Sequence, residues 1–295
     1  MKTQKNIFIA FILNLLFSIF ELFGGFFTGS VAILSDAAHD FGDAVSIGIA
    51  YCLEKASRKE PNEKYSYGYA RFSVLGGLLT TLILLTSSGI VIYNAILRII
   101  TPTTIDYNGM MLFAVIGLTV NLIATYFTHG GKSINQKAVN LHMLEDVLGW
   151  LVVLVGAIVM RFTNFYILDP ILSIAVAVFI LIHSVKNLKQ ITDIFLVKTP
   201  KNVDVNEILE HVKHIDGVIE AHHIHVWTLD GDIHCATLHI VAQRIDSTIK
   251  MAVKDELKEH GIAHVTIEME TIEDGCEEKT CNIKTQAAHC HHHHH

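Results

Sequence analysis

The sequence has few charged residues for its length. Of its 295 residues, 17% are Asp, Glu, Lys or Arg, whereas a soluble globular protein has about 25%. Hydrophobic residues make up 51% of the chain, and they gather in blocks before roughly residue 200. The net charge is −7 and no basic patch stands out, so nucleic acid is not an expected partner. The totals exclude a wholly soluble protein.

Cysteine is also scarce, and one familiar zinc motif is missing. The five cysteines are not spaced like a disulfide framework in a chain of this size. If the polar last third is cytosolic, its thiols should be reduced and available to soft metals. The His-Glu-x-x-His string of zinc proteases is absent. The terminal histidines 291–295 fit either a purification tag or a native tail.

Six segments are long and apolar enough to cross a bilayer, which takes about 20 residues each. Basic residues gather in the link between the second and third segments and after the fourth and sixth, whereas the opposite loops offer only Arg98 and Arg161. This bias predicts that both termini face the cytoplasm. The predicted spans are 6–27, 31–53, 72–97, 109–128, 138–160 and 168–188.

The last third alternates helix and strand signals in the order α-β-β-α-β, which predicts a small α+β domain with both helices on one face of a sheet. The expected fold class is therefore an α-helical membrane protein with six transmembrane helices and a small C-terminal α+β cytoplasmic domain. The expected division is 1–198 (transmembrane), 199–275 (cytoplasmic) and 276–295 (a tail with Cys and His that contains either a purification tag or native histidines).

Two His-x-x-x-Asp pairs lie inside predicted spans. They are His39/Asp43 in the second span and His142/Asp146 in the fifth. Residues four apart share one helix face, so two packed spans would bring together two imidazoles and two carboxylates, which zinc accepts in tetrahedral geometry. Charge within a span costs roughly 2.5–3.5 kcal/mol per residue, which makes these residues a functional hypothesis. The alternative is that each pair is a hydrogen bond holding helices together.

Other polar residues accompany the two pairs. Asp36 returns to nearly the same helix face as Asp43, so it is a possible accessory residue that orients the site or moves protons. Asp40 and Glu145 should point elsewhere, toward other helices or a dimer contact. Asn14, Glu21 and Asn121 are interpreted as packing or water-cavity residues.

Several strings in register resemble the cation diffusion facilitator family over nearly the whole chain. They are Glu21-Leu-Phe-Gly-Gly25, Gly29-Ser-Val-Ala-Ile-Leu-Ser-Asp36-Ala-Ala-His39-Asp-Phe-Gly-Asp43, Tyr65-Ser-Tyr-Gly-Tyr-Ala-Arg71-Phe, Tyr93-Asn-Ala-Ile-Leu-Arg98-Ile-Ile-Thr-Pro102, Asn140-Leu-His142-Met-Leu-Glu-Asp146 and Asp169-Pro170. The resemblance implies six spans, a ferredoxin-like cytoplasmic domain, a homodimer, and metal efflux in exchange for protons. The two-His, two-Asp set is similar to the zinc branch of the family, and imidazole also suits zinc better than manganese.

The same resemblance implies a second metal site, which lies in the cytoplasmic domain. His222 and His239 match its metal-binding positions, and His264 and Glu270 match further ligands in some members. The Cys276/Cys281 pair is similar to a tail pair that joins this site. The alternatives are exposed strand histidines and an inert tail. Strict alternation would place His223 and His225 on the face opposite His222.

These observations predict a zinc transporter that works as a proton-coupled antiporter by alternating access. Zn²⁺ would be the transported substrate and a regulatory ligand of the cytoplasmic domain. A short polar N-terminus suits a bacterial inner membrane. The alternatives are transport of Cd²⁺, Co²⁺ or Fe²⁺, a passive channel, a metal sensor, and an intramembrane metalloenzyme, although no enzymatic activity is expected because a four-ligand site has no open coordination position.

Overall fold

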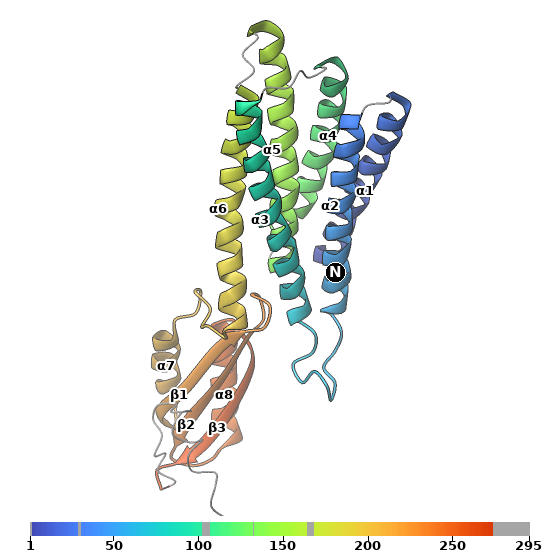
Figure 1. Ribbon diagram of the computed structural model, residues 1–295. Coiled ribbons are helices and arrows are strands. Elements are labelled where there is room, and N and C mark those ends of the chain that lie inside the picture. Colours follow the sequence, from blue (N-terminus) through green and yellow to red (C-terminus); the bar gives the residue numbers. More distant parts are fainter. Residues whose placement is uncertain (1, 29–30, 102–106, 132, 164–167, 274–295) are drawn as a thin grey trace, which may run out of the picture. The chain divides into compact units, whose positions relative to one another are not determined.

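The chain folds into two compact units, Met1–Asp193 and Ile194–His295. The computed structural model (Figure 1) describes residues 2–28, 31–101, 107–131, 133–163 and 168–273. The first unit contains long helices and the second contains a small sheet with two helices. Each unit has its own hydrophobic core.

Six long helices make up the first unit, and each contains one predicted span. Apolar windows of sufficient length and hydropathy to cross a membrane lie in four of them, at Thr3–Phe23, Arg71–Leu97, Ile134–Gly156 and Ser173–Phe195, and Ala114–Thr128 is a shorter apolar helix. The second helix carries three aspartates, which lower its hydropathy. The helices are α1 (Lys2–Thr28), α2 (Val31–Ala56), α3 (Arg71–Ile100), α4 (Tyr107–Thr128), α5 (Ile134–Thr163) and α6 (Leu168–Phe195).

Helices α1, α2, α4 and α5 share one core. Its buried members include Ile7 of α1, Ile47 of α2, Ala124 of α4 and Met143 of α5. Close approach of α4 to α5 depends on Gly117, because a Cβ there would lie only 2.6 Å from the Trp150 ring. This packing brings the two helices with His-x-x-x-Asp pairs into one four-helix group.

A buried carboxylate fastens the end of α2 to α3 and α5. Glu54 is 4% exposed, and its Oε2 accepts hydrogen bonds from Ser73 Oγ (2.7 Å), Ser133 Oγ (3.1 Å) and Asn135 Nδ2 (3.4 Å). Asn135 also donates to the Ala50 carbonyl at 2.8 Å. Because buried polar groups need partners, this network fixes how far α5 lies along α2. It also explains why α5 begins at Ile134, four residues before the predicted span.

The second unit shows the predicted α-β-β-α-β order. Asp204 and Asp246 cap the two helices by accepting hydrogen bonds from backbone N–H groups. The elements are α7 (Val205–Lys213), β1 (Val218–Thr228), β2 (His234–Ala242), α8 (Ser247–Glu259) and β3 (Ile262–Thr271). The sheet order is β1-β2-β3, with β1 antiparallel and β3 parallel to β2.

Both helices of this unit cover the same face of the sheet. Ile208 and Val212 of α7 and Val253 and Leu257 of α8 share one core with strand residues such as Leu238. The residues beside Leu238 on β2, such as His239, therefore face away from the helices. The predicted arrangement of both helices on one face is confirmed.

A β-bulge corrects one prediction about β1. His222 pairs with His239 and His225 pairs with Thr237. Two residues of β1, at positions 223 and 224, therefore lie opposite one residue of β2, Leu238. His223 has a φ of 51°, a left-handed conformation that accommodates the extra residue in the strand. The prediction that His225 lies on the face opposite His222 is therefore wrong, because the bulge resets the alternation.

Candidate metal sites

Three of the four predicted transmembrane ligands meet between α2 and α5. One ligand atom from each of Asp43, His142 and Asp146 lies within 4.8 Å of the others. Asp43 Oδ1 is 3.6 Å from His142 Nε2, and the two residues are 5% and 1% exposed. Asp43 comes from α2 and the other two from α5, one helical turn apart. Spacing along α5 and packing against α2 together produce the convergence.

The other two predicted members of this site, His39 and Asp36, stay predictions. His39 and Asp36 lie on α2, but their side chains are outside the described residues. His39 precedes Asp43 by one helical turn, which keeps the prediction of a fourth ligand consistent with the helix.

Helix α1 adds a contact from Asn14, a residue interpreted from the sequence as a packing or water-cavity residue. Asn14, which is 2% exposed, donates from Nδ2 to Asp146 Oδ2 at 3.5 Å. A donor to the second oxygen of a carboxylate orients it for metal binding. The signal in the sequence was an amide in the middle of an apolar span, but only packing of α1 on the group identified its partner.

Glu145 faces a different helix from its neighbour Asp146. Its carboxylate accepts hydrogen bonds from Ser87 Oγ, at 3.2 and 3.4 Å, and from Ser88 Oγ at 3.5 Å, both on α3. This agrees with the prediction that Glu145 points away from the site, since consecutive helical residues are about 100° apart.

The charge of the group suits a dication. Asp43 and Asp146 together carry −2 when ionised, and a neutral His142 adds a nitrogen ligand without charge. A divalent cation would cancel this charge, which is otherwise costly inside a membrane protein. Mixed imidazole and carboxylate ligands favour zinc and similar transition metals over magnesium or calcium.

A second group lies on the face of the β1-β2-β3 sheet that points away from α7 and α8. His222, His239 and Glu270 offer ligand atoms within 4.8 Å of one another. His239 Nδ1 is hydrogen-bonded to Glu270 Oε1 at 2.5 Å, and His222 Nε2 lies 3.7 Å from Glu270 Oε2. Within the described part of the chain, both ring nitrogens of the buried His222 and Glu270 Oε2 lack hydrogen-bond partners. Unsatisfied atoms of these types, facing one another, fit a metal ion.

The bulge surrounds this group with further histidines. The His223 ring stacks on His239 with centroids 4.7 Å apart, and Glu268 Oε2 lies 3.4 Å from His239 Nε2. Burial, followed by the imidazoles of His223 and His239, lowers the pKa of His225. A neutral imidazole is the metal-binding form. Alternation alone missed His223, because a bulge has no reliable signal in this sequence.

The structure does not bring His264 into this group. His264 pairs with Cys235 near the start of β3, six residues before Glu270, which is about 20 Å along a strand. The interpretation of His264 as a ligand beside Glu270 therefore fails within one chain. Cys276 and Cys281 lie outside the described residues, so their predicted role stays a prediction.

Two family models together match nearly the whole chain. The cation efflux transmembrane domain matches residues 7–196, and the cytoplasmic domain of cation efflux proteins matches residues 200–272. The chain belongs to the cation diffusion facilitator family.

Curated relatives of this facilitator match along almost their full length. A cadmium, cobalt and zinc/H(+)-K(+) antiporter of Bacillus subtilis is 31% identical, covering 99% of this chain and 97% of the relative. The zinc transporter ZitB of Yersinia pestis is 31% identical, covering 100% and 96%. The metal cation efflux system protein CzcD of Cupriavidus metallidurans is 32% identical, covering 90% and 86%.

The family and these relatives establish the general activity. The facilitator is an integral membrane protein and a divalent cation efflux transporter. The family and the names of these relatives point away from enzymatic catalysis.

Proposed function

We propose that this facilitator exports Zn²⁺ in exchange for protons through a site formed by His39, Asp43, His142 and Asp146. The observation that carries the proposal is the convergence of Asp43, His142 and Asp146 from two helices, with Asp43 and His142 buried. The ligand types favour zinc, and zinc appears in the names of relatives such as ZitB.

Proton coupling follows from the chemistry of the ligands. Metal and proton compete for the same lone pairs, so a protonated site releases zinc and a deprotonated site binds it. Alternating access would load Zn²⁺ from the cytoplasm, expose the site to the other side, and let protons displace the metal. Return of the protonated site then moves protons inward. A relative named as a cadmium, cobalt and zinc/H(+)-K(+) antiporter supports exchange of metal for protons.

The finer architecture belongs to the same proposal. All six long helices would span the bilayer, with both termini in the cytoplasm and residues 1–198 forming the transmembrane domain. Residues 199–275 would form a ferredoxin-like domain that pairs with its copy in a homodimer, and 276–295 a tail. The α-β-β-α-β order and the basic cytoplasmic links support these assignments. Bacterial relatives support a bacterial inner membrane.

The cytoplasmic group would serve as a zinc-dependent regulator. His222, His239 and Glu270 would hold the ion, with Cys276 and Cys281 as predicted additional ligands. Zinc bound there can shift transport only if the site has different affinities in two conformations of the protein. The unsatisfied nitrogens of His222 support binding.

Selectivity is the main alternative within transport. The names of relatives include cadmium and cobalt, and both metals accept imidazole ligands. Competition between Zn²⁺ and each of these ions in one flux assay distinguishes them.

The test is zinc flux into inside-out proteoliposomes, with and without an imposed pH gradient. The exchange predicts faster zinc entry when the lumen is acidic. Equal flux with and without the gradient would refute proton coupling. Unchanged zinc flux in Asp43→Ala would refute the site itself.

A further inference from the structure

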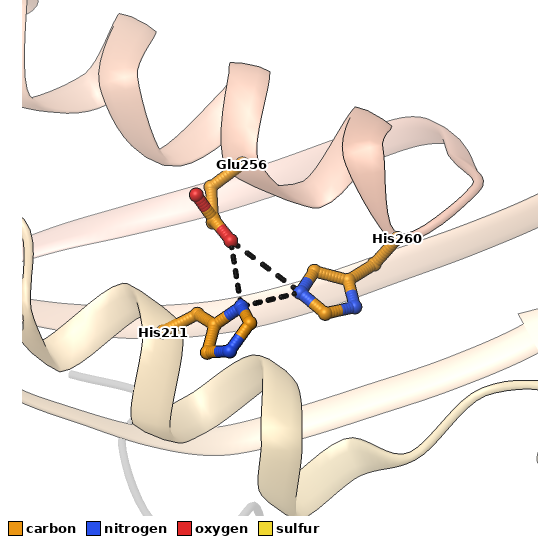
Figure 2. A group of neighbouring side chains, drawn as sticks. All are labelled: His211, Glu256 and His260. Atoms are coloured by element: carbon orange, nitrogen blue, oxygen red, sulfur yellow. Dashed lines mark hydrogen bonds and ion pairs between the residues drawn. The ribbon is translucent and has the colours of Figure 1, made fainter.

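Another cluster of metal-ligand side chains lies on the helices of the cytoplasmic unit. Figure 2 shows His211 of α7 facing Glu256 of α8 and His260, which caps the C-terminal end of α8. His211 Nδ1 is 3.0 Å from Glu256 Oε1 and 3.0 Å from His260 Nε2. His260 Nε2 is 3.4 Å from the same Glu256 oxygen. The three potential ligand atoms therefore all lie within 3.4 Å of one another.

These separations match a zinc coordination shell. With Zn–N and Zn–O bonds near 2.0–2.2 Å, two ligands of a tetrahedral ion are about 3.3 Å apart. The observed separations of 3.0, 3.0 and 3.4 Å would change by only a few tenths of an ångström on binding. Three atoms at these separations form a triangle close in size to one face of that tetrahedron.

A proton is the competing occupant of this cluster. Two imidazole nitrogens 3.0 Å apart need a proton between them, because facing lone pairs repel each other. A dication would replace that proton and satisfy all three atoms at once. The side chains of His211, Glu256 and His260 are 49%, 25% and 17% exposed, so a water molecule can complete the fourth corner.

The supporting helices hold the cluster in place. His211 adjoins Val212, and Glu256 adjoins Leu257, and both apolar residues lie in the core that covers one face of the sheet. The group of His222, His239 and Glu270 is on the other face. The two clusters share no residue.

We propose that His211, Glu256 and His260 form a separate zinc site that clamps α7 to α8. It takes borderline transition ions of the Zn²⁺ type, because its two imidazoles and one carboxylate are unsuited to Mg²⁺. The proposal does not rest on the transport mechanism.

Hydrogen–deuterium exchange of the full-length protein tests the clamp, with chelator, with Zn²⁺, and with Mg²⁺. Peptides covering 205–213 and 247–260 report on the opening of the two helices. Zinc at ten times the titration midpoint should slow exchange that requires α7 to separate from α8 by about tenfold. Magnesium should not slow it. The terminal histidines are the same in every variant, so any zinc that they bind affects all the proteins equally.

Substitutions identify where the protecting zinc binds. His211→Gln and His260→Gln should each abolish the zinc-dependent protection of both helices. His214→Gln is the matched control, since His214 Nδ1 contacts the Glu210 carbonyl and not the cluster. His239→Gln removes a ligand of the strand group and should leave the protection intact.

Three results would overturn the clamp. They are no zinc protection in the parent protein, full protection in both His211→Gln and His260→Gln, and loss of protection in His239→Gln. Metal-free exchange of the strands, compared with the parent, shows that each variant is folded. Transport in proteoliposomes is a separate readout, so failure of the clamp leaves the transport proposal standing.

Discussion

Two neighbouring carboxylates on α5 offer a matched comparison of position within the membrane unit. Asp146→Asn and Glu145→Gln each replace a carboxylate with an amide of nearly the same shape, one residue apart. Asp146 belongs to the group with Asp43 and His142, whereas Glu145 is hydrogen-bonded to Ser87 and Ser88. If the group is the transport site, only the first substitution should impair zinc binding.

The expected magnitude follows from the role of Asp146. Loss of a residue that merely orients a metal ligand costs about 10–100-fold in affinity. Asp146 would be a ligand itself, and its loss also leaves Asp43 alone to balance a dication. We therefore expect Asp146→Asn to weaken zinc affinity by more than about 100-fold, or about 2.8 kcal/mol. Glu145→Gln keeps an oxygen that can accept from the serines, so its effect should stay below about tenfold.

The assay measures initial rates of zinc transport in proteoliposomes as a function of free zinc, with a chelator used to buffer the free zinc concentration. Reconstituted amounts and thermal unfolding of both variants serve as controls for folding. Equal losses in the two variants would show that total acidity of α5, and not the face of Asp146, controls binding. A larger loss in Glu145→Gln would refute the geometric argument.

Three further predictions concern packing, ligand orientation and pH. Gly117→Ala should destabilise the helical unit by about 1–3 kcal/mol, because its Cβ would overlap the Trp150 ring; an unchanged thermal unfolding midpoint would contradict the close approach. Asn14→Ala should weaken zinc affinity by about tenfold or more by removing the donor to Asp146, and zinc titration checks it. Burial and two neighbouring imidazoles lower the pKa of His225. Below pH 6.5 the unfolded state therefore binds more protons at this residue than the folded state, so the free energy of unfolding falls as the pH drops from 6.5 toward the lowered pKa. The loss of thermal stability on acidification should be smaller in His225→Gln, and an equal loss would contradict this assignment.

The sequence by itself predicted a two-part organisation and the residue types proposed as ligands of the membrane site. Apolar blocks of bilayer length are typical of membrane helices, and each predicted span lies within an observed helix. Four-residue spacing put His142 and Asp146 on one face because helix geometry is local. The α-β-β-α-β order was predictable for the same reason, since capping and alternation depend on near neighbours.

Tertiary structure decided which distant residues meet. The donation from Asn14 to Asp146 depends on how α1 packs, and the buried contacts of Glu54 depend on α2, α3 and α5 together. The bulge at His223 depends on pairing with β2, and it overturned the alternation predicted for β1. His211 and His260 are 49 residues apart, and only the shared core of α7 and α8 brings them together. Contacts between elements follow from packing of whole surfaces, which no short stretch of sequence encodes.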